Sequence, residues 1–252
     1  IVYIANILVG SIKEHGRQRR TAIRQLEQFC RDRNVEAFPL SIVSDSIDHG
    51  VTMLMQTAAV GPIRPNMAVF GWSSDETRLS TFVQHLRTAS ELGMSIVLIK
   101  DNGKLVTHQE KRIDVWWRGQ QRNIGFLVTL AYLMKQSEGW SAAELRVKTI
   151  VDREDEREET AQHMDAYLKR QRIDAEVEVL MKDRPDVFDI IRASSEGASL
   201  VLFGMRPPRE DESDEEYVKN YEYMLSHTRS LPPTAIALAA ENIEFHHLFD
   251  PE

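Results

Sequence analysis

Glycine-containing turns after apolar segments are the first features of this sequence that could bind a phosphate group. They lie at residues 10–16, 71–74 and 204–208. Backbone N–H groups of such turns can hold an anion, above all where a helix begins. Residues 10–16 lack the glycine spacing of a dinucleotide fingerprint and the Gly-Lys-Ser/Thr of a P-loop, so we interpret them as a plain turn. The last turn loses two donors to its prolines. We therefore expect no bound cofactor.

The histidines and the single cysteine do not form a pattern for catalysis or metal binding. No His-x-x-x-His pair lies near a carboxylate, and no Gly-x-Ser-x-Gly occurs. Cys30 shares helical spacing with Ile23 and Leu26, which predicts a small side chain in the core. One cysteine permits no internal disulfide and suits a reducing compartment. We expect no catalytic residue and no metal site.

Strand-like and helix-like segments alternate along the chain and would have to position any site. We expect strands at 1–9, 35–43, 66–72, 95–100, 113–117, 145–151, 174–181, 199–205 and 234–240. We expect helices at 19–33, 46–59, 75–92, 123–136, 155–170, 187–195 and 214–229. Strands joined by helices predict an α/β fold with a doubly wound, mostly parallel sheet.

This alternation occurs twice. The segment Met67–Gly71 resembles Leu200–Gly204, and each precedes a long helix and a short apolar strand. We therefore predict two repeated α/β lobes. The N-terminal lobe spans 1–102, a linker spans 103–112, and the C-terminal lobe spans 113–252.

The charge of the chain limits its partners. The net charge is −8 and the pI is near 5.6, so we expect no nucleic-acid partner. The segment 13–33 is basic, and its Arg17, Arg19 and Arg20 could face an anionic membrane surface or form a solvated helix face. No apolar stretch is long enough to span a membrane. Because the chain starts without Met inside an apolar run, we expect it to be part of a longer protein.

Two adjacent tryptophans mark the most distinctive segment, Ile113-Asp114-Val115-Trp116-Trp117. Neighbouring residues of a strand face opposite sides. One ring is therefore expected in the core, and the other against a helix or a partner. Other unusual segments are Arg64-Pro65-Asn66 before an apolar strand and Met205-Arg206-Pro207-Pro208 after one.

These segments, in this order, resemble the cytosolic C-terminal domain of cation-chloride cotransporters. That family has an Ile-Asp-Val-Trp-Trp strand, a Lys/Arg-Pro-Asn segment before an apolar strand, and a strand ending in Met-Pro-x-Pro. The agreement spans about residues 35–240. The residues after Trp117 depart from the family pattern, and the long phosphorylated insertions of animal members are absent, which favours a prokaryotic member.

The resemblance implies a non-catalytic regulatory and dimerisation domain of an electroneutral Na⁺, K⁺ and Cl⁻ symporter. It further implies two lobes similar to universal stress proteins, a homodimer, a transmembrane domain in the same polypeptide, and a place on the cytoplasmic side of the cell membrane. The matching residues are then structural or interface residues: Arg64, Pro65, Asn66, Asp114, Trp116, Trp117, Met205, Pro207 and Pro208.

Two other classes of protein stay open at this point. A soluble nucleotide-binding or sensor protein of the universal-stress type would share the predicted fold. An enzyme on a doubly wound sheet is the third reading, although the sequence shows no convergent acid, base or nucleophile.

Overall fold

The computed structural model describes residues 2–58, 64–72, 78–101, 111–118, 121–209 and 211–240. The strands are β1 (Tyr3–Val9), β2 (Phe38–Ser44), β3 (Met67–Gly71), β4 (Ser95–Lys100), β5 (Arg112–Trp116), β6 (Glu144–Val151), β7 (Glu176–Met181), β8 (Leu200–Gly204) and β9 (Thr234–Leu238). The helices are α1 (Ile12–Asp32), α2 (Ile47–Ala58), α3 (Leu79–Glu91), α4 (Gln121–Lys135), α5 (Arg157–Arg170), α6 (Val187–Ser194) and α7 (Asp214–Thr228), with a 3₁₀ turn, η2, at Glu154–Glu156.

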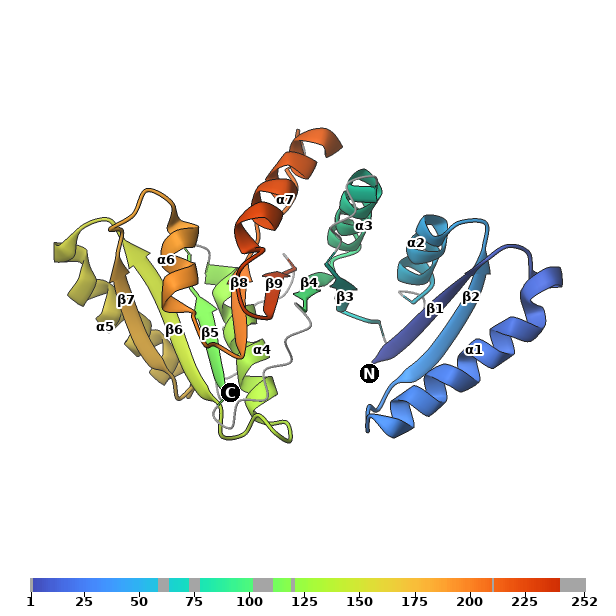
Figure 1. The fold of residues 1–252 in the computed structure, drawn as a ribbon, viewed down its shortest axis with the longest axis horizontal. Coiled ribbons are helices and arrows are strands. Elements are labelled where there is room, and N and C mark those ends of the chain that lie inside the picture. Colours follow the sequence, from blue (N-terminus) through green and yellow to red (C-terminus); the bar gives the residue numbers. More distant parts are fainter. Residues whose placement is uncertain are drawn as a thin grey trace.

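The predicted α/β fold with a mostly parallel sheet is confirmed. Seven strands form one sheet in the order β3-β4-β9-β8-β5-β6-β7, and every neighbouring pair is parallel except β4 and β9. That antiparallel pair joins the two halves of the chain into a single sheet (Figure 1). Strands β1 and β2 form a separate parallel pair at one side of the molecule. Residues 103–110 of the expected linker lie outside the described residues, and Arg112 already belongs to β5.

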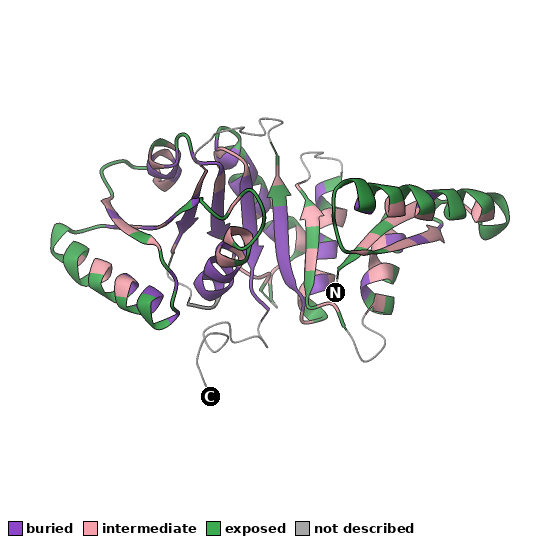
Figure 2. Ribbon diagram, turned by 90° about the horizontal axis from the view of Figure 1, so that it is seen from below, coloured by how far each residue is buried: buried purple, intermediate pink, exposed green. Residues whose placement is uncertain are grey.

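Helices cover both faces of the large sheet, and each face has its own apolar cluster. On one face, α4 and α5 bury residues such as Val115, Leu127 and Leu168. On the other, α3, α6 and α7 bury residues such as Leu86 and Phe203. Figure 2 shows the inner strands of this sheet as the most buried part of the molecule, whereas the edge strands β3 and β7 are partly exposed. Burial on both faces is what the continuous apolar runs of its inner strands require.

The two adjacent tryptophans face opposite sides, as expected. Trp116 is buried in the cluster under α6 and α7. Trp117 packs on the other face, where its ring lies 5.1 Å from that of Tyr167 and 6.1 Å from that of His163, both on α5. Each ring therefore fixes a helix to its own face of the sheet.

The plain turn predicted for residues 10–16 is wrong. Residues 12–16 belong to the first turns of α1, which begins at Ile12, and only Gly10 and Ser11 precede the helix. Ser11 is its N-cap, and Ser11 and Glu14 exchange hydrogen bonds in a capping box. This arrangement satisfies two N–H groups that would otherwise lack partners, so the helix can start ahead of its amphipathic part.

Candidate functional site

Several of the family-motif residues meet at the carboxyl ends of two neighbouring strands. β5 and β8 are paired, with Trp116 opposite Phe203, and each chain then leaves the sheet at Trp117 and Met205. Met205 is buried, and Pro207 and Pro208 follow it in a half-buried segment. In open α/β sheets this is where ligands commonly bind, because the strand order reverses there and leaves a crevice.

A hollow of about 340 Å³ lies at these strand ends. We call it the strand-end hollow. Its floor contains Trp116 and Phe203, and its rim carries charged side chains, namely Arg118, Asp152, Lys182 and Arg206. An apolar floor with a few polar groups is the usual composition of a small-molecule site.

Two of the four rim charges are cations already paired with acids. Lys182 Nζ lies 3.2 Å from Asp152 Oδ1. Arg206 forms a two-pronged ion pair with Glu212, donating from Nη1 over 2.8 Å and from Nη2. This contact lowers the pKa of Glu212 to about 2, since the hydrogen bonds from Arg206 favour the ionised carboxylate. Two of the three rim cations are therefore compensated by acids, and Arg118 is the remaining cation of the rim that could bind a phosphate.

Arg206 also holds the start of α7 in place. Its guanidinium lies 5.2 Å from the ring centre of Tyr217, and the Tyr217 hydroxyl donates to the Arg206 carbonyl over 3.0 Å. Burial raises the pKa of Tyr217 well above its usual value. The segment after β8 is thus a structural clamp, and its prolines stop the strand before it.

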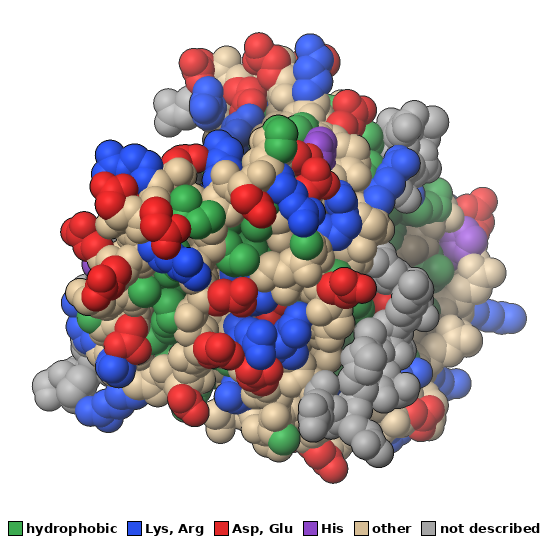
Figure 3. Space-filling view, turned by 60° about the vertical axis from the view of Figure 1, so that its left-hand side comes forward, with side chains coloured by type: hydrophobic (Ala, Val, Ile, Leu, Met, Phe, Trp, Pro, Cys, Tyr) green, Lys and Arg blue, Asp and Glu red, His purple; other side chains and the backbone are tan. Residues whose placement is uncertain are grey.

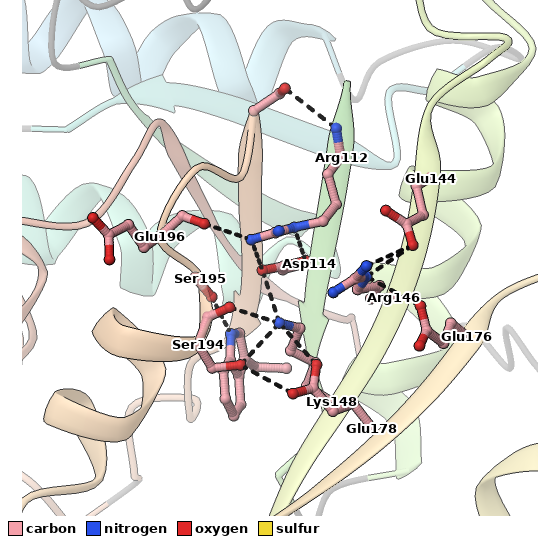
Figure 4. A network of polar contacts seen from close by, with 12 residues as sticks. Arg112, Asp114, Glu144, Arg146, Lys148, Glu176, Glu178, Ser194, Ser195 and Glu196 are labelled. Atoms are coloured by element: carbon pink, nitrogen blue, oxygen red, sulfur yellow. Dashed lines mark hydrogen bonds and ion pairs between the residues drawn. The ribbon is translucent and has the colours of Figure 1, made fainter. Parts of the chain in front are cut away.

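Asp114 belongs to a buried ion network that links β5 to its neighbours (Figure 4). Lys148 on β6 contacts Asp114 Oδ2 at 3.2 Å and Glu178 Oε2 on β7 at 3.0 Å. It also donates to the Ser194 carbonyl and hydroxyl at the end of α6, over 2.8 and 2.9 Å. Arg112 Nε holds the other Asp114 oxygen at 3.0 Å.

The network explains why an aspartate can occupy the middle of a sheet. Asp114 and Lys148 are 0% and 1% exposed, and a buried charge persists only when it is paired and hydrogen-bonded. Trp116 extends the network, because its Nε1 donates to Ser195 Oγ over 3.0 Å. Four elements, β5, β6, β7 and α6, are therefore joined through one set of polar contacts (Figure 4).

A glycine is required where β8 ends. A Cβ atom on Gly204 would lie 2.8 Å from Asn123 Nδ2, which donates to the Met205 carbonyl over 2.8 Å. Asn123 Oδ1 accepts from the Ala239 N–H over 2.9 Å. The side chain of Asn123, near the start of α4, thus holds the ends of β8 and β9 together.

The remaining predicted residues lie away from this cluster. Arg64, Pro65 and Asn66 precede β3, and β4 and β9 separate β3 from β8. Asn66 accepts the Ser95 N–H over 2.8 Å and so extends the β3–β4 pairing by one residue. The glycine-containing turn at residues 71–74 is described only in part, because residues 73 and 74 lie outside the described residues.

The basic segment makes up nearly all of α1, and its arginines are not equivalent. Arg19 Nε donates to the Ser41 carbonyl of β2 over 2.6 Å, so Arg19 fixes the helix to its strand. Arg17 and Arg20 are exposed. Cys30, on the same helix, is buried as predicted.

Elsewhere, acidic and basic side chains are mixed. Figure 3 shows this mixture over one face of the molecule. Within the described residues, no group of three or more His, Cys, Asp or Glu side chains could hold a metal ion. No helix in the described part of the chain is long and apolar enough to cross a bilayer.

Sequence reasoning missed Lys148 and the Arg206–Glu212 clamp. Apolar and basic residues alternate in Leu145-Arg146-Val147-Lys148, so the pattern places Lys148 on the polar face of its strand. The neighbouring residues in the sequence do not indicate that this face is buried at Lys148. Asp114 is the signal that could have indicated Lys148. An acid within an otherwise apolar strand is buried, and a buried carboxylate needs a cation beside it.

The chain was compared with models of protein families. The sequence model of solute carrier family 12 matches residues 2–109 and 105–187, which together cover most of the chain.

Solved structures with the same fold agree with this match. A crystal structure of the cytoplasmic domain of a prokaryotic cation chloride cotransporter superposes with a TM-score of 0.69 at 14% identity, covering 98% of this chain and 88% of that one. A universal stress protein from Pseudomonas aeruginosa UCBPP-PA14 gives a TM-score of 0.56 at 11% identity, with coverages of 98% and 85%. A Pseudomonas aeruginosa PAO1 protein of unknown function gives 0.54 at 12%, again with 98% and 85%. At these identities the likeness concerns the fold, and it confirms the expected similarity to universal stress proteins.

Proposed function

The chain belongs to solute carrier family 12, and from this we propose that it is the cytoplasmic, non-catalytic part of an electroneutral cation-chloride cotransporter. The family match over residues 2–187 carries the proposal. The cotransporter domain with the same fold supports it. On this proposal the ions bind in transmembrane helices of the same polypeptide, and no residue of this chain coordinates them.

The gene itself provides the first test. Upstream of Ile1 we expect a reading frame with about twelve apolar segments of roughly 20 residues each. A start codon shortly before Ile1, with no such segments, would contradict the proposal.

We propose further that the chain regulates transport and pairs with a second copy. The polar contacts of the buried network and the Arg206–Glu212 clamp join strands and helices of the chain, which supports a structural role for these residues. None of these groups has the arrangement of a nucleophile with a base, which supports a role without catalysis.

Dimerisation is tested by sedimentation of the 252-residue chain at several concentrations. One chain has a mass of 29.0 kDa, and we expect a species of about twice that mass at micromolar concentration. A monomer at every concentration would remove dimerisation from the proposal and leave the family assignment intact.

Regulation is tested in the full-length transporter. Chloride-dependent rubidium uptake is measured with residues 1–252 present and deleted, at matched surface expression. We expect the deletion to change the uptake rate and to leave the ion dependence unchanged, because the ion sites lie elsewhere. A changed ion dependence would contradict this division of roles.

A second candidate function is nucleotide sensing of the universal-stress type. The position of the strand-end hollow favours it, since the hollow lies at the carboxyl ends of β5, β6 and β8. The paired cations on its rim count against it. Thermal unfolding with ATP or AMP separates the two: a ligand at ten times its Kd raises stability by about 1.4 kcal/mol.

A further inference from the structure

The strand-end hollow is rich in aromatic and sulfur-containing side chains. Helices α6 and α7 lie next to each other over this part of the sheet, where the ring centres of Phe188 and Tyr223 are 5.8 Å apart (Figure 1). Rings pack against one another offset or edge to face, and methionines adapt to the shape left between them, so this lining favours a flat ligand. The aromatic members of the lining are Trp116, Trp117, Phe188, Phe203 and Tyr223, and the methionines are Met205 and Met224.

Contacts between these elements hold the walls of the hollow in place. The ring of Phe188 lies 6.3 Å from that of Phe203 in an edge-to-face arrangement, which fixes α6 to β8. His227 Nε2, in the last turn of α7, lies 3.3 Å from Oδ2 of Asp186, the N-cap of α6. Fixed walls suit a small-molecule site, because few side chains then have to be ordered on binding.

Asn220 places an unused hydrogen-bond donor in one wall. It precedes Tyr223 and Met224 by one turn of α7 and lines the hollow with them. Its Nδ2 atom is buried and has no hydrogen-bond partner among the described residues. Buried donors are almost always bonded, since an unpaired one loses its hydration without compensation. A ligand oxygen beside Asn220 would supply the missing acceptor.

The charges around the hollow leave one positive charge uncompensated. Of its three cations, Lys182 is paired with Asp152. Arg206 is paired with Glu212. Arg118, two residues after β5, has no ion-pair partner in the part of the chain that the structure describes. A ligand with a single negative charge matches this balance, whereas a second negative charge would meet Asp152.

The loop after β8 is unsuited to a chain of phosphates. Sites that hold polyphosphates use several backbone N–H groups and leave room for the ligand beside a glycine. Here Pro207 and Pro208 remove two donors from the loop. The space beside Gly204 is filled, because a Cβ there would lie 2.8 Å from Asn123 Nδ2.

We propose that the strand-end hollow binds a small aromatic monocarboxylic acid. The ring of the ligand packs among the aromatic side chains, and its carboxylate pairs with Arg118, whose planar guanidinium suits two-pronged contact with a carboxylate. A hydroxyl oxygen on the ring accepts from Asn220 Nδ2. This site goes beyond the transport role and does not depend on it.

The test is an NMR titration of the isotope-labelled 252-residue chain with three related probes. The first probe, para-coumarate, carries a ring, a carboxylate and a hydroxyl. Cinnamate lacks the hydroxyl, and para-vinylphenol lacks the carboxylate. We expect para-coumarate to bind once per chain with a Kd of about 1 mM or lower, and to shift the side-chain amide signals of Asn220.

Replacing Arg118 tests the contact with the carboxylate. Arg118→Gln should weaken the binding of para-coumarate and cinnamate by about tenfold or more, and should leave para-vinylphenol unchanged, because only the two acids carry the charge. The matched control is Arg153→Gln, which removes an exposed arginine that does not line the hollow and should change no Kd.

Replacing Asn220 tests the buried donor. Asn220→Leu should weaken the two hydroxyl-bearing probes by about threefold or more and should spare cinnamate. If this variant does not fold, Arg118→Gln and its control still decide the proposal, because Arg118 is exposed and its replacement leaves the core intact.

Three results would overturn the proposal. The first is a lack of binding for all three probes, and the second is an equal effect of Arg118→Gln and Arg153→Gln. The third comes from a parallel titration with AMP. If AMP binds more tightly than para-coumarate and shifts the same signals, the hollow is a nucleotide site instead.

Discussion

Lys148 Nζ lies 3.2 Å from Asp114 Oδ2, and both side chains are buried in the middle of the sheet. The pair joins β6 to β5, and the further contacts of Lys148 with Glu178 and Ser194 bring in β7 and α6. Such a pair adds little net stability over an apolar one, but breaking it is costly, because one charge is left without a partner.

Replacing Lys148 alone should therefore strongly destabilise the protein. For Lys148→Met we expect a loss of about 3–5 kcal/mol in the free energy of unfolding by urea. Adding Asp114→Leu should recover part of the loss, since the unpaired carboxylate is gone. Lys182→Met is the matched control: its pair with Asp152 is exposed, and its loss should cost about 0–1 kcal/mol. Equal losses for Lys148→Met and Lys182→Met would contradict this view of the network.

The contact between α3 and α7 should contribute to the association of the two halves. Arg87 Nε lies 2.6 Å from Asp214 Oδ1, and its guanidinium lies 5.8 Å from the Tyr217 ring centre. A double-mutant cycle with Arg87→Met and Asp214→Ala should give a coupling energy of about 1 kcal/mol or more, because both side chains are largely buried. The same cycle on Arg192 and Asp189, an exposed pair within α6, should give about 0.3 kcal/mol. A value no larger for Arg87 than for Arg192 would show that the contact is incidental.

Much of this fold could be predicted from the sequence, because its elements follow local patterns. The expected strand at Ser95–Lys100 agrees with β4 at both ends, and the opposite orientations of Trp116 and Trp117 follow from strand geometry alone. Ser11-Ile12-Lys13-Glu14 is the sequence pattern of a capping box and marks the start of α1, whereas the spacing of the glycines in this segment predicts only a turn.

Other features depend on contacts between distant segments. The antiparallel pairing of β4 with β9 joins strands from opposite halves, and no local pattern specifies it. The sequence around Lys148 predicts a surface residue. The structure shows it buried because Asp114 and Glu178, from neighbouring strands, form ion pairs with it.

Arg17 and Arg20 are two exposed arginines of α1 that could contact anionic lipid. Each arginine near such a surface contributes about 1 kcal/mol, so Arg17→Gln with Arg20→Gln should weaken binding to phosphatidylserine vesicles by about tenfold or more. Arg153→Gln with Arg157→Gln removes the same charge from another exposed segment and should have less effect. Arg19 is unsuitable for this test, because it also bonds to Ser41. Vesicle flotation measures the binding, and equal effects of the two pairs would contradict a membrane role for α1.

His85 should make the stability of the protein fall in mild acid. It is 7% exposed between α3 and α2, where its Nε2 lies 3.8 Å from Asp48 Oδ1. Burial lowers its pKa, Asp48 acts in the opposite direction, and Arg78 adds to the lowering. The folded state therefore favours the neutral imidazole. Its contribution is complete above the unfolded pKa of about 6.5 and is lost as the pH falls below that value, because the unfolded chain then binds the extra proton.

The measurement is the urea unfolding free energy of the wild type and of His85→Gln between pH 5 and pH 8. The stability advantage of the wild type should be constant above about pH 6.5 and should shrink below it. In Asp48→Asn the loss should begin in the same range and be steeper, since the carboxylate that favours imidazolium is gone. A wild-type advantage that grows as the pH falls would mean that Asp48 dominates over burial, and that the contact between α2 and α3 is strengthened by acid instead of weakened.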